Sequence, residues 1–160
     1  MQFLNYLSRY VLSIFCIFAV TAVAVPFPHP TIKNAILINN KPVFQRLVLD
    51  QGYYMDGIYT APTKEDLEKD IRLSMDVGFN GARLHQKVFE RWFLYYADKM
   101  GYLCYGEYAS WGFDYTKEEN SNIYIREWLE SVKRDYNHPC IIGWIPMNEN
   151  WDIKGIHQSN

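Results

Sequence analysis

Two polar residues, Asn148 and Glu149, directly follow the apolar run Ile141–Met147. Polar groups at the end of a buried strand cost free energy unless they line a cavity or meet hydrogen-bond partners. Two further charged residues, Arg83 and Glu107, also lie at the ends of strand-like segments. Carboxylates, a guanidinium group and an amide can together hydrogen-bond the hydroxyl groups of a ligand. We therefore expect these four side chains to form part of a ligand site.

Other polar and aromatic residues follow the same strand-like segments. Tyr and Trp offer a flat apolar face beside a polar edge, which suits the C–H faces and hydroxyl groups of a sugar ring. The pattern indicates a carbohydrate site on one rim of a sheet. Besides the four residues above, its candidate members are Asp50, His85, Trp111 and Trp151.

Several of these residues also have a purely structural interpretation. An arginine at a strand end often pairs with a nearby carboxylate, and Glu107 is a candidate partner for Arg83. His85 alone would be typical of a satisfied surface histidine. A metal site of His85, Glu107 and His138 has neither an H-E-x-x-H pattern nor a Cys/His ligand spacing to support it. The sequence therefore predicts no metal and no cofactor.

The elements that must position these residues alternate between strand and helix. The first helix is expected to begin after Thr63, with Asp66 completing a capping box, and the second to end at Gly101. A third helix carries Trp128 and Tyr136, which we expect in the core. The second helix carries Phe89, Phe93, Tyr96/Ala97 and Met100, and the strands are expected over 43–49, 80–84, 102–106 and 141–147, with a turn over 39–42 before the first.

Strands that are joined by helices and are continuously apolar indicate a parallel sheet buried on both faces. A dinucleotide-binding fold would need a G-x-G-x-x-G turn, and the sequence has neither that turn nor a P-loop. Two architectures remain, a segment of a (β/α)₈ barrel and a flavodoxin-like sheet. Both place functional residues at the carboxyl ends of the strands.

The length and the net charge of the chain exclude some functions and some folds. The 160 residues carry a net charge of −2, without the basic excess that nucleic-acid binding usually requires, so no nucleic-acid partner is expected. Aromatic residues reach 17%, and three cysteines are too few for a disulfide scaffold. A complete (β/α)₈ barrel takes roughly 200 residues or more, so we expect about three βα units and a fourth strand, a partial barrel.

The N-terminus has the pattern of a signal peptide. The apolar stretch Val11–Val25 is shorter than a membrane-spanning helix needs, and small residues at Ala22 and Ala24 precede the proline-rich segment 26–30. We expect residues 1–24 to be a signal peptide and residues 25–160 to be the barrel domain. The protein would then be secreted or periplasmic. The alternative is an uncleaved membrane anchor, and only in that case would the membrane be a partner.

The segments around these candidates resemble glycoside hydrolase family 2, which includes β-galactosidases, β-glucuronidases and β-mannosidases. The most specific match joins His138-Pro139-Cys140-Ile141-Ile142 to Asn148-Glu149, and weaker matches lie at 40–44, 77–83 and 99–107. The resemblance covers about residues 32–152 and implies the amino-terminal half of a catalytic TIM barrel. It implies a retaining mechanism in which Glu149 is the general acid/base and Asn148 hydrogen-bonds the sugar 2-hydroxyl. Arg83 would orient a nucleophile, which this family carries on strand seven.

The sequence also departs from that family. The family's Ser-His after the strand-two arginine falls on His85-Gln86, and the domains that normally precede the barrel do not match. We therefore expect a truncated barrel that holds the acid/base and lacks the nucleophile. The alternative is a non-catalytic half-barrel that binds saccharide through Tyr53, Trp111 and Trp151. Its open strand edges would favour self-association.

Overall fold

The computed structural model describes residues 35–149, which fall into two units with their boundary between Val43 and Phe44. The described part of the first unit is a hairpin of β1 (Leu37–Ile38) and β2 (Lys41–Pro42), paired antiparallel. Its turn residues Asn39 and Asn40 have φ values of 51° and 61°, which the primed hairpin turns require. The turn expected over 39–42 is thus confined to its first two residues. The predicted signal peptide lies outside the described residues.

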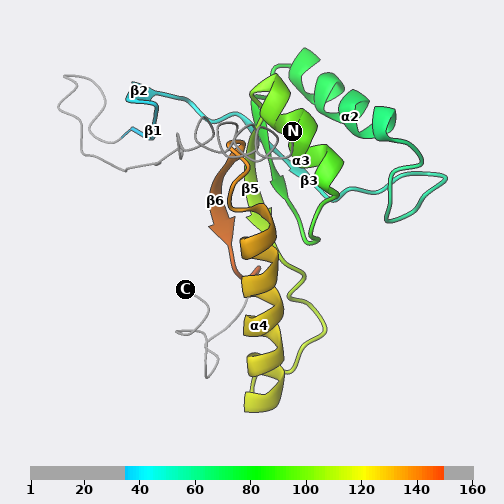
Figure 1. Ribbon diagram of the computed structural model, residues 1–160, viewed down its shortest axis with the longest axis vertical. Coiled ribbons are helices and arrows are strands. Elements are labelled where there is room, and N and C mark those ends of the chain that lie inside the picture. Colours follow the sequence, from blue (N-terminus) through cyan, green and yellow to red (C-terminus); the bar gives the residue numbers. More distant parts are fainter. Residues whose placement is uncertain (1–34, 150–160) are drawn as a thin grey trace, which may run out of the picture. The chain divides into compact units, whose positions relative to one another are not determined.

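The second unit contains a parallel four-stranded sheet. Its strands β3 (Leu47–Asp50), β4 (Gly81–Leu84), β5 (Leu103–Glu107) and β6 (Ile141–Ile145) lie side by side in the order of the sequence (Figure 1). A flavodoxin-like sheet would exchange the order of its first two strands. The sequential parallel order therefore favours a segment of a (β/α)₈ barrel.

The first strand of this sheet begins later than the sequence predicts. Strand β3 starts at Leu47, because the preceding residues bond to Asn80 and its neighbours instead of joining the ladder. The backbone N–H of Arg46 donates to Asn80 Oδ1 at 2.7 Å, and Asn80 Nδ2 donates to the Phe44 carbonyl at 2.9 Å. Asn80 consequently lies just outside β4 and ties the entries of two strands together.

Three helices connect the strands: α2 (Lys64–Asp76), α3 (Arg91–Met100) and α4 (Glu118–Asp135). The capping box of Thr63 and Asp66 is present, and Gly101 ends α3 with a φ of 68°, as expected. The prediction that Phe89 lies in the second helix is wrong, since Glu90 is the N-cap of α3. Phe89 is nevertheless buried.

Helix α4 presents a different face to the core than predicted. Trp128 is buried as expected, but Tyr136 is 63% exposed at the C-cap. The buried face runs through Ser121, Tyr124 and Trp128, at helical spacing of three and four residues. Tyr136 falls outside that stripe, so the prediction that it is a core residue is wrong.

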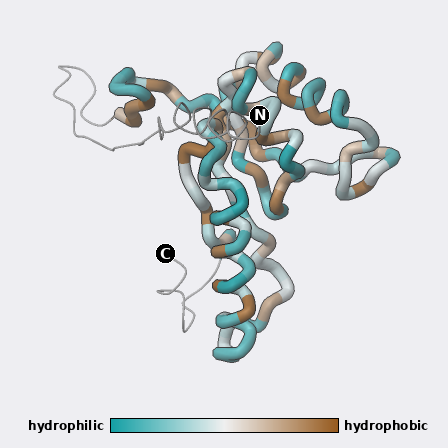
Figure 2. The backbone as a smooth tube through the Cα atoms, viewed as in Figure 1, coloured by the Kyte–Doolittle hydropathy of each residue, from teal (hydrophilic) through white to brown (hydrophobic). Residues whose placement is uncertain are grey.

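Two apolar clusters hold the unit together. Leu67 and Ile71 of α2 meet Phe93 of α3 over the sheet, and Tyr124 and Trp128 of α4 pack beside Trp144 of β6. Figure 2 shows hydrophobic and hydrophilic residues alternating along the helices, as a one-sided contact with the sheet requires. The opposite face of the sheet carries Arg83, Tyr105 and Glu107, which alternate with residues of the helix-facing cluster.

Candidate active site

Arg83 and Glu107 lie on the same face of neighbouring strands. Arg83 pairs in register with Tyr105, two residues before Glu107, so the arginine reaches along the sheet to the carboxylate. Arg83 Nε donates to Glu107 Oε2 at 2.6 Å, and Nη2 donates to Oε1 at 3.2 Å. The Glu107 side chain is 0% exposed, whereas that of Arg83 is 31% exposed. The ion pair that the sequence offered as an alternative for Arg83 is therefore confirmed.

The same guanidinium group also holds Asn148. Arg83 Nη2 donates to Asn148 Oδ1 at 2.6 Å, and the Asn148 backbone N–H donates to Ser110 Oγ at 3.2 Å. Its hydrogen bond to Glu107 raises the pKa of Arg83, and burial opposes that rise without cancelling it. The negative charges of Glu107 and Glu149 raise it further. One arginine thus joins the carboxyl ends of three strands.

His85 belongs to this network. Its Nδ1–H donates to Glu107 Oε1 at 2.8 Å, and its backbone N–H donates to the Asp50 carbonyl, also at 2.8 Å. The His85 side chain is mostly buried. Glu107 therefore binds a guanidinium and an imidazole at once, and its two oxygens are both engaged.

Glu149 directly follows the buried Asn148 and is itself exposed. Its φ of 49° places it in the left-handed region, which costs free energy for a residue with a Cβ. Such local strain clusters at functional sites, where neighbouring contacts enforce it. Here Asn148, the residue before Glu149, is fixed by its contacts with Arg83 and Ser110.

An aromatic cleft adjoins the network. It has a volume of about 320 Å³, and Trp111, its predicted aromatic, is 67% exposed. Gln86 Oε1 accepts hydrogen bonds from the backbone N–H groups of Ser110 and Trp111, at 3.0 and 3.3 Å. The lining residues are Gln51, Tyr53, Tyr59, His85, Gln86, Ala109 and Trp111. Tyr59 was not predicted because it lies far along the chain from the end of β3, and Ser110 was not predicted because nothing in the sequence distinguishes it from other loop serines.

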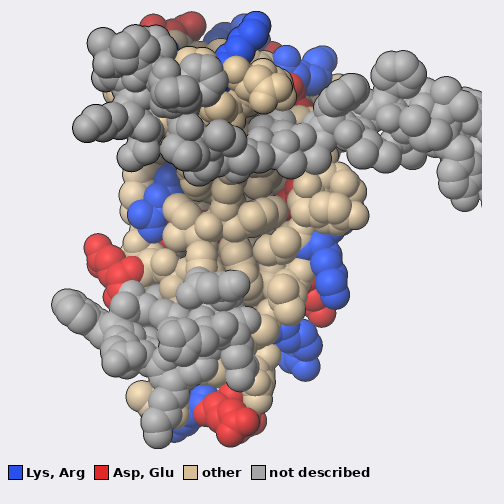
Figure 3. Space-filling model, turned by 90° about the vertical axis from the view of Figure 1, so that its left-hand side faces the viewer, with Lys and Arg blue, Asp and Glu red and all other residues tan. Residues whose placement is uncertain are grey.

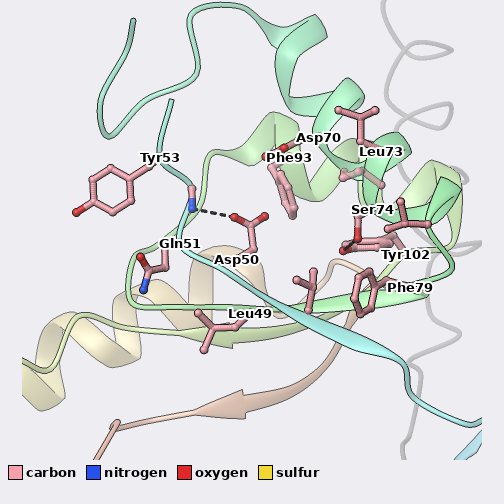
Figure 4. Close-up of a pocket in the computed structure, with 14 residues that line it drawn as sticks. Leu49, Asp50, Gln51, Tyr53, Asp70, Leu73, Ser74, Phe79, Phe93 and Tyr102 are labelled. Atoms are coloured by element: carbon pink, nitrogen blue, oxygen red, sulfur yellow. Dashed lines mark hydrogen bonds between the residues drawn. The ribbon is translucent and has the colours of Figure 1, made fainter. Parts of the chain in front are cut away.

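Asp50 lies apart from these groups. Figure 4 shows its carboxylate on the side of β3 toward Phe93, whereas Leu49 points to the other side. Asp50 Oδ1 accepts from the Gly52 N–H at 2.8 Å, and burial raises the pKa of Asp50 despite that bond. Together with Asp70 it lines a 570 Å³ cleft between β3 and the two helices α2 and α3. Trp151 lies outside the described residues.

A second cluster of metal-ligating side chains lies where β6 begins. Asp98, His138 and Cys140 each have a ligand atom within 4.8 Å of the others. His138 contacts Asp98 at 2.6 Å, at the amino end of β6, and so lies at the opposite end of the strands from the His85–Glu107 pair. His138 is therefore too far along the strands to share a metal ion with His85 and Glu107. Among residues 35–149, no helix has the length and apolar character needed to cross a membrane.

Comparisons with known proteins show that this chain is similar to parts of several glycoside hydrolases. A β-galactosidase of Vibrio cholerae serotype O1 is 27% identical over 146 residues, which cover 79% of this chain and 13% of that enzyme. A β-glucuronidase from Ruminococcus gnavus, solved in complex with D-glucuronic acid, matches with a TM-score of 0.68 at 22% identity, over 75% of this chain and 21% of that one. A family 2 glycosyl hydrolase from Bacteroides cellulosilyticus matches with a TM-score of 0.59 at 24% identity, over 68% of this chain and 14% of that one.

No protein-family model matches the chain. The chain spans 13% of the curated β-galactosidase that it matches. The matches confirm the resemblance to glycoside hydrolase family 2, and the solved structures show that the α/β unit has the fold of a TIM-barrel segment.

Proposed function

We propose that this chain supplies the acid/base half of the active site of a retaining glycoside hydrolase that acts on β-linked glycosides. Glu149 is the general acid/base, which protonates the glycosidic oxygen and then activates water. Asn148 hydrogen-bonds the sugar 2-hydroxyl. The observation that carries the proposal is the bridge from Arg83 to both Glu107 and Asn148, which fixes the residue immediately before an exposed, strained glutamate.

The proposal assigns the nucleophile to a strand beyond β6. Retention needs a second carboxylate about 5–5.5 Å from the acid/base. Glu107 is the nearest strand-end candidate, but its side chain is fully buried and both of its oxygens accept hydrogen bonds from Arg83 or His85. A nucleophile needs an oxygen free to attack the anomeric carbon. We therefore assign to Glu107 the role of holding Arg83 and His85 in place.

The test uses the protein encoded by the complete open reading frame that contains this chain. It measures how the rate of hydrolysis depends on the leaving group of the substrate. Glu149→Gln removes proton donation, so hydrolysis of aryl β-galactosides, β-glucuronides and β-mannosides with poor leaving groups should fall by about 10²–10⁴. Dinitrophenyl glycosides need little protonation and should lose less in the first step. Glu130→Gln, the same change on the exposed side of α4, is the matched control and should retain full activity.

Azide gives an independent readout of the same role. In Glu149→Ala, azide can attack the glycosyl–enzyme intermediate without a general base, so it should restore turnover and yield the β-glycosyl azide. Equal losses for good and poor leaving groups, with no azide product, would show that Glu149 is not the acid/base. Turnover by residues 25–160 alone, abolished by Glu149→Gln, would instead make Glu107 the nucleophile.

Two further proposals concern the edges of the sheet and the N-terminus. Within the described residues β3 and β6 each have one neighbouring strand, and we propose that these edges pair with further barrel strands or with a second copy. Figure 3 shows one side of the molecule with a continuous uncharged area in its middle. Light scattering of residues 25–160 should therefore report oligomers, and a stable monomer would contradict this.

We also propose cleavage of the signal peptide after Ala24, which makes the protein secreted or periplasmic. The apolar stretch 11–25 and the small residues before the prolines support it. Mass spectrometry of protein recovered from outside the cytoplasm should show that its first residue is Val25. An intact Met1 would support the anchor instead.

A further inference from the structure

Asp98, His138 and Cys140 form a compact group of metal-ligating side chains at the amino end of β6, away from the candidate active site. Their ligand atoms are a carboxylate oxygen, an imidazole nitrogen and a thiol sulfur, and all lie within 4.8 Å of one another. The Asp98 and His138 side chains are 21% and 24% exposed, whereas Cys140 is buried. A cation therefore has a path from solvent past the carboxylate and the imidazole to the thiol.

Backbone hydrogen bonds hold the three residues together before any cation arrives. Asp98 lies in the last turn of α3, and its Oδ1 accepts from the Cys140 N–H at 2.9 Å. The His138 N–H donates to the carbonyl of Asp135, the last residue of α4, at 2.9 Å. The Cys140 carbonyl accepts from the Cys104 N–H of β5 at 2.7 Å. The ligand segment is thus anchored on both sides, which lowers the entropy cost of binding.

Metal binding exchanges two hydrogen bonds for bonds to a cation. His138 Nδ1 and Asp98 Oδ2 share a hydrogen over 2.6 Å, and Cys140 Sγ–H donates to the Leu94 carbonyl at 3.6 Å. On coordination the thiol releases its proton to solvent, and the neutral imidazole carries its proton on Nε2 instead of Nδ1. The carboxylate and the thiolate then supply two negative charges, which balance a divalent cation and offset the cost of its desolvation.

The donor set favours zinc over the other common divalent cations. Mg²⁺ and Ca²⁺ take oxygen ligands, whereas zinc accepts thiolate, imidazole and carboxylate together. A hydrogen bond with the Cys104 thiol and burial both raise the pKa of the Cys140 thiol, so this thiol stays protonated without a cation. A thiol that coordinates zinc is deprotonated outright.

We propose that Asp98, His138 and Cys140 bind a zinc ion, with water as the fourth ligand. The ion replaces a hydrogen bond with a metal bridge and so ties α3 to the start of β6. Its site lies at the amino end of the strands, where a barrel generally keeps stabilising contacts, and it shares no residue with the network of Arg83 and Glu107. The ion therefore stabilises the fold, and the proposal is independent of the proposed function.

The first experiment measures binding, on the protein encoded by the complete open reading frame after removal of metals with EDTA. Calorimetry with Zn²⁺ should detect a site that Cys140→Ser and Asp98→Asn each weaken by at least about tenfold. Cys104→Ser is the matched control, because it removes a neighbouring buried thiol that is turned to the Tyr102 carbonyl, and it should leave the affinity unchanged. Equal affinity in all three variants and the unchanged protein would overturn the proposal.

Cobalt gives a second readout that does not depend on a variant that folds. Co²⁺ accepts the same donors as zinc, and a thiolate ligand gives it a charge-transfer absorption in the near ultraviolet. That absorption should appear in the reduced, unchanged protein, disappear when Zn²⁺ is added, and be absent from Cys140→Ser. A folded, reduced protein that takes up Co²⁺ without this absorption, or takes up none, would overturn ligation by Cys140.

The unfolding midpoint tests the stabilising role and separates it from catalysis. Zn²⁺ at about a hundred times its Kd should raise the midpoint by a few degrees, and EDTA should reverse the rise. The rise should be lost in Cys140→Ser and complete in Glu149→Gln, whatever the outcome of the leaving-group test. An unchanged midpoint would overturn the stabilising role. A disulfide between Cys104 and Cys140, found by peptide mapping without reductant, would overturn the site because it leaves no thiolate.

Discussion

The two ends of the sheet each carry a histidine bonded to a carboxylate, and the two pairs are built differently. At the carboxyl end His85 bonds Glu107 at 2.8 Å, and where β6 begins, at its amino end, His138 bonds Asp98 at 2.6 Å. Their surroundings decide what each pair can do. Within a barrel, the amino-terminal face generally serves stability and the carboxyl-terminal face generally serves catalysis.

At the amino end, the side chains of the Asp98–His138 pair bond only to each other and to the start of β6, among the contacts of the described residues. Asp98 accepts from His138 through Oδ2 and from the Cys140 N–H through Oδ1, at 2.9 Å, so it ties α3 to the entry of β6. Burial on its own would raise the pKa of Asp98, but the hydrogen bonds from His138 and Cys140 outweigh it and leave that pKa below its ordinary value. Both oxygens of Asp98 are therefore engaged by groups of the protein itself.

The pair at the carboxyl end continues into other groups. Glu107 also binds Arg83, which extends to Asn148 and so to the exposed Glu149. A partly exposed arginine and an exposed, strained glutamate therefore remain accessible at this end. The comparison shows that a histidine–carboxylate pair is a poor guide to function until its further partners are known.

The largest effect should come from breaking the carboxyl-end network at its centre. Arg83→Met removes the guanidinium and leaves the buried Glu107 with His85 as its one side-chain partner among the described residues, which should lower the free energy of unfolding by about 3 kcal/mol. Chemical denaturation monitored by tryptophan fluorescence would measure it. Arg91→Met, on the exposed start of α3, is the control and should change stability little. A similar small change for Arg83→Met would show that the network is not a structural unit.

Breaking the amino-end pair should affect stability alone. Asp98→Asn removes the charge that faces His138 and weakens two hydrogen bonds, which should cost about 1–3 kcal/mol. In the complete reading-frame product used to test the proposed function, Asp98→Asn should leave glycosidase activity unchanged at a temperature well below the unfolding midpoint. Asp56→Asn is an exposed control. A fall in kcat for Asp98→Asn at constant KM would break the comparison, because it would give the amino end a part in catalysis.

Most of the strands and the helix caps could be predicted because they depend on local patterns, whereas local patterns left the order of the strands open between two architectures. The Thr63–Asp66 capping box and the stop at Gly101 need only neighbours within a turn, and the structure has both. The predicted start of β3 was wrong because the observed start depends on hydrogen bonds with Asn80, more than thirty residues away. Such long-range side-chain bonds leave no periodic signal in the sequence.

The same reasoning applies to the candidate site. Arg83 and Asn148 could be found because both lie at strand ends, and the structure joins them directly. Asp50 also ends a strand, but strand alternation turns it toward the helices, and a strand end by itself does not show which face a side chain takes. Tyr59 lines the cleft from a loop that long-range and local hydrogen bonds shape, including the one from Lys87 Nζ to the Tyr59 carbonyl.

The amino-end pair should also make stability sensitive to acid. Since the pKa of Asp98 is lower in the folded state than in the unfolded chain, its contribution is fully present above the ordinary value near 3.8. That contribution is lost as the pH falls through the folded-state value. Unfolding midpoints measured from pH 7 down to pH 3 should therefore fall less steeply for Asp98→Asn than for the unchanged protein. Parallel curves would show that Asp98 has the same pKa in both states.

The smallest effect should come from Asp50, and its sign is opposite. Burial raises the pKa of Asp50, with Asp70 among the opposing charges, so ionisation of its carboxyl group disfavours the folded state. That penalty is absent below the unfolded value, grows as the pH rises from the unfolded to the folded-state value, and is complete above the folded-state value. Asp50→Asn keeps an oxygen for the Gly52 N–H and removes the charge, so it should raise the unfolding midpoint slightly at pH 7.

That gain should disappear near pH 3, where Asp50 is protonated in both states and the two proteins become alike in charge at this position. Sugar binding should be unaffected, because the carboxylate lies toward Phe93, on the opposite side of β3 from Leu49. A contradicting result would be that Asp50→Asn binds β-disaccharides more weakly while its unfolding midpoint stays the same. Asp50 would then belong to the sugar site, as its position at a strand end predicts. This result would also show that a side chain on the helix-facing side of β3 takes part in sugar binding at the carboxyl end.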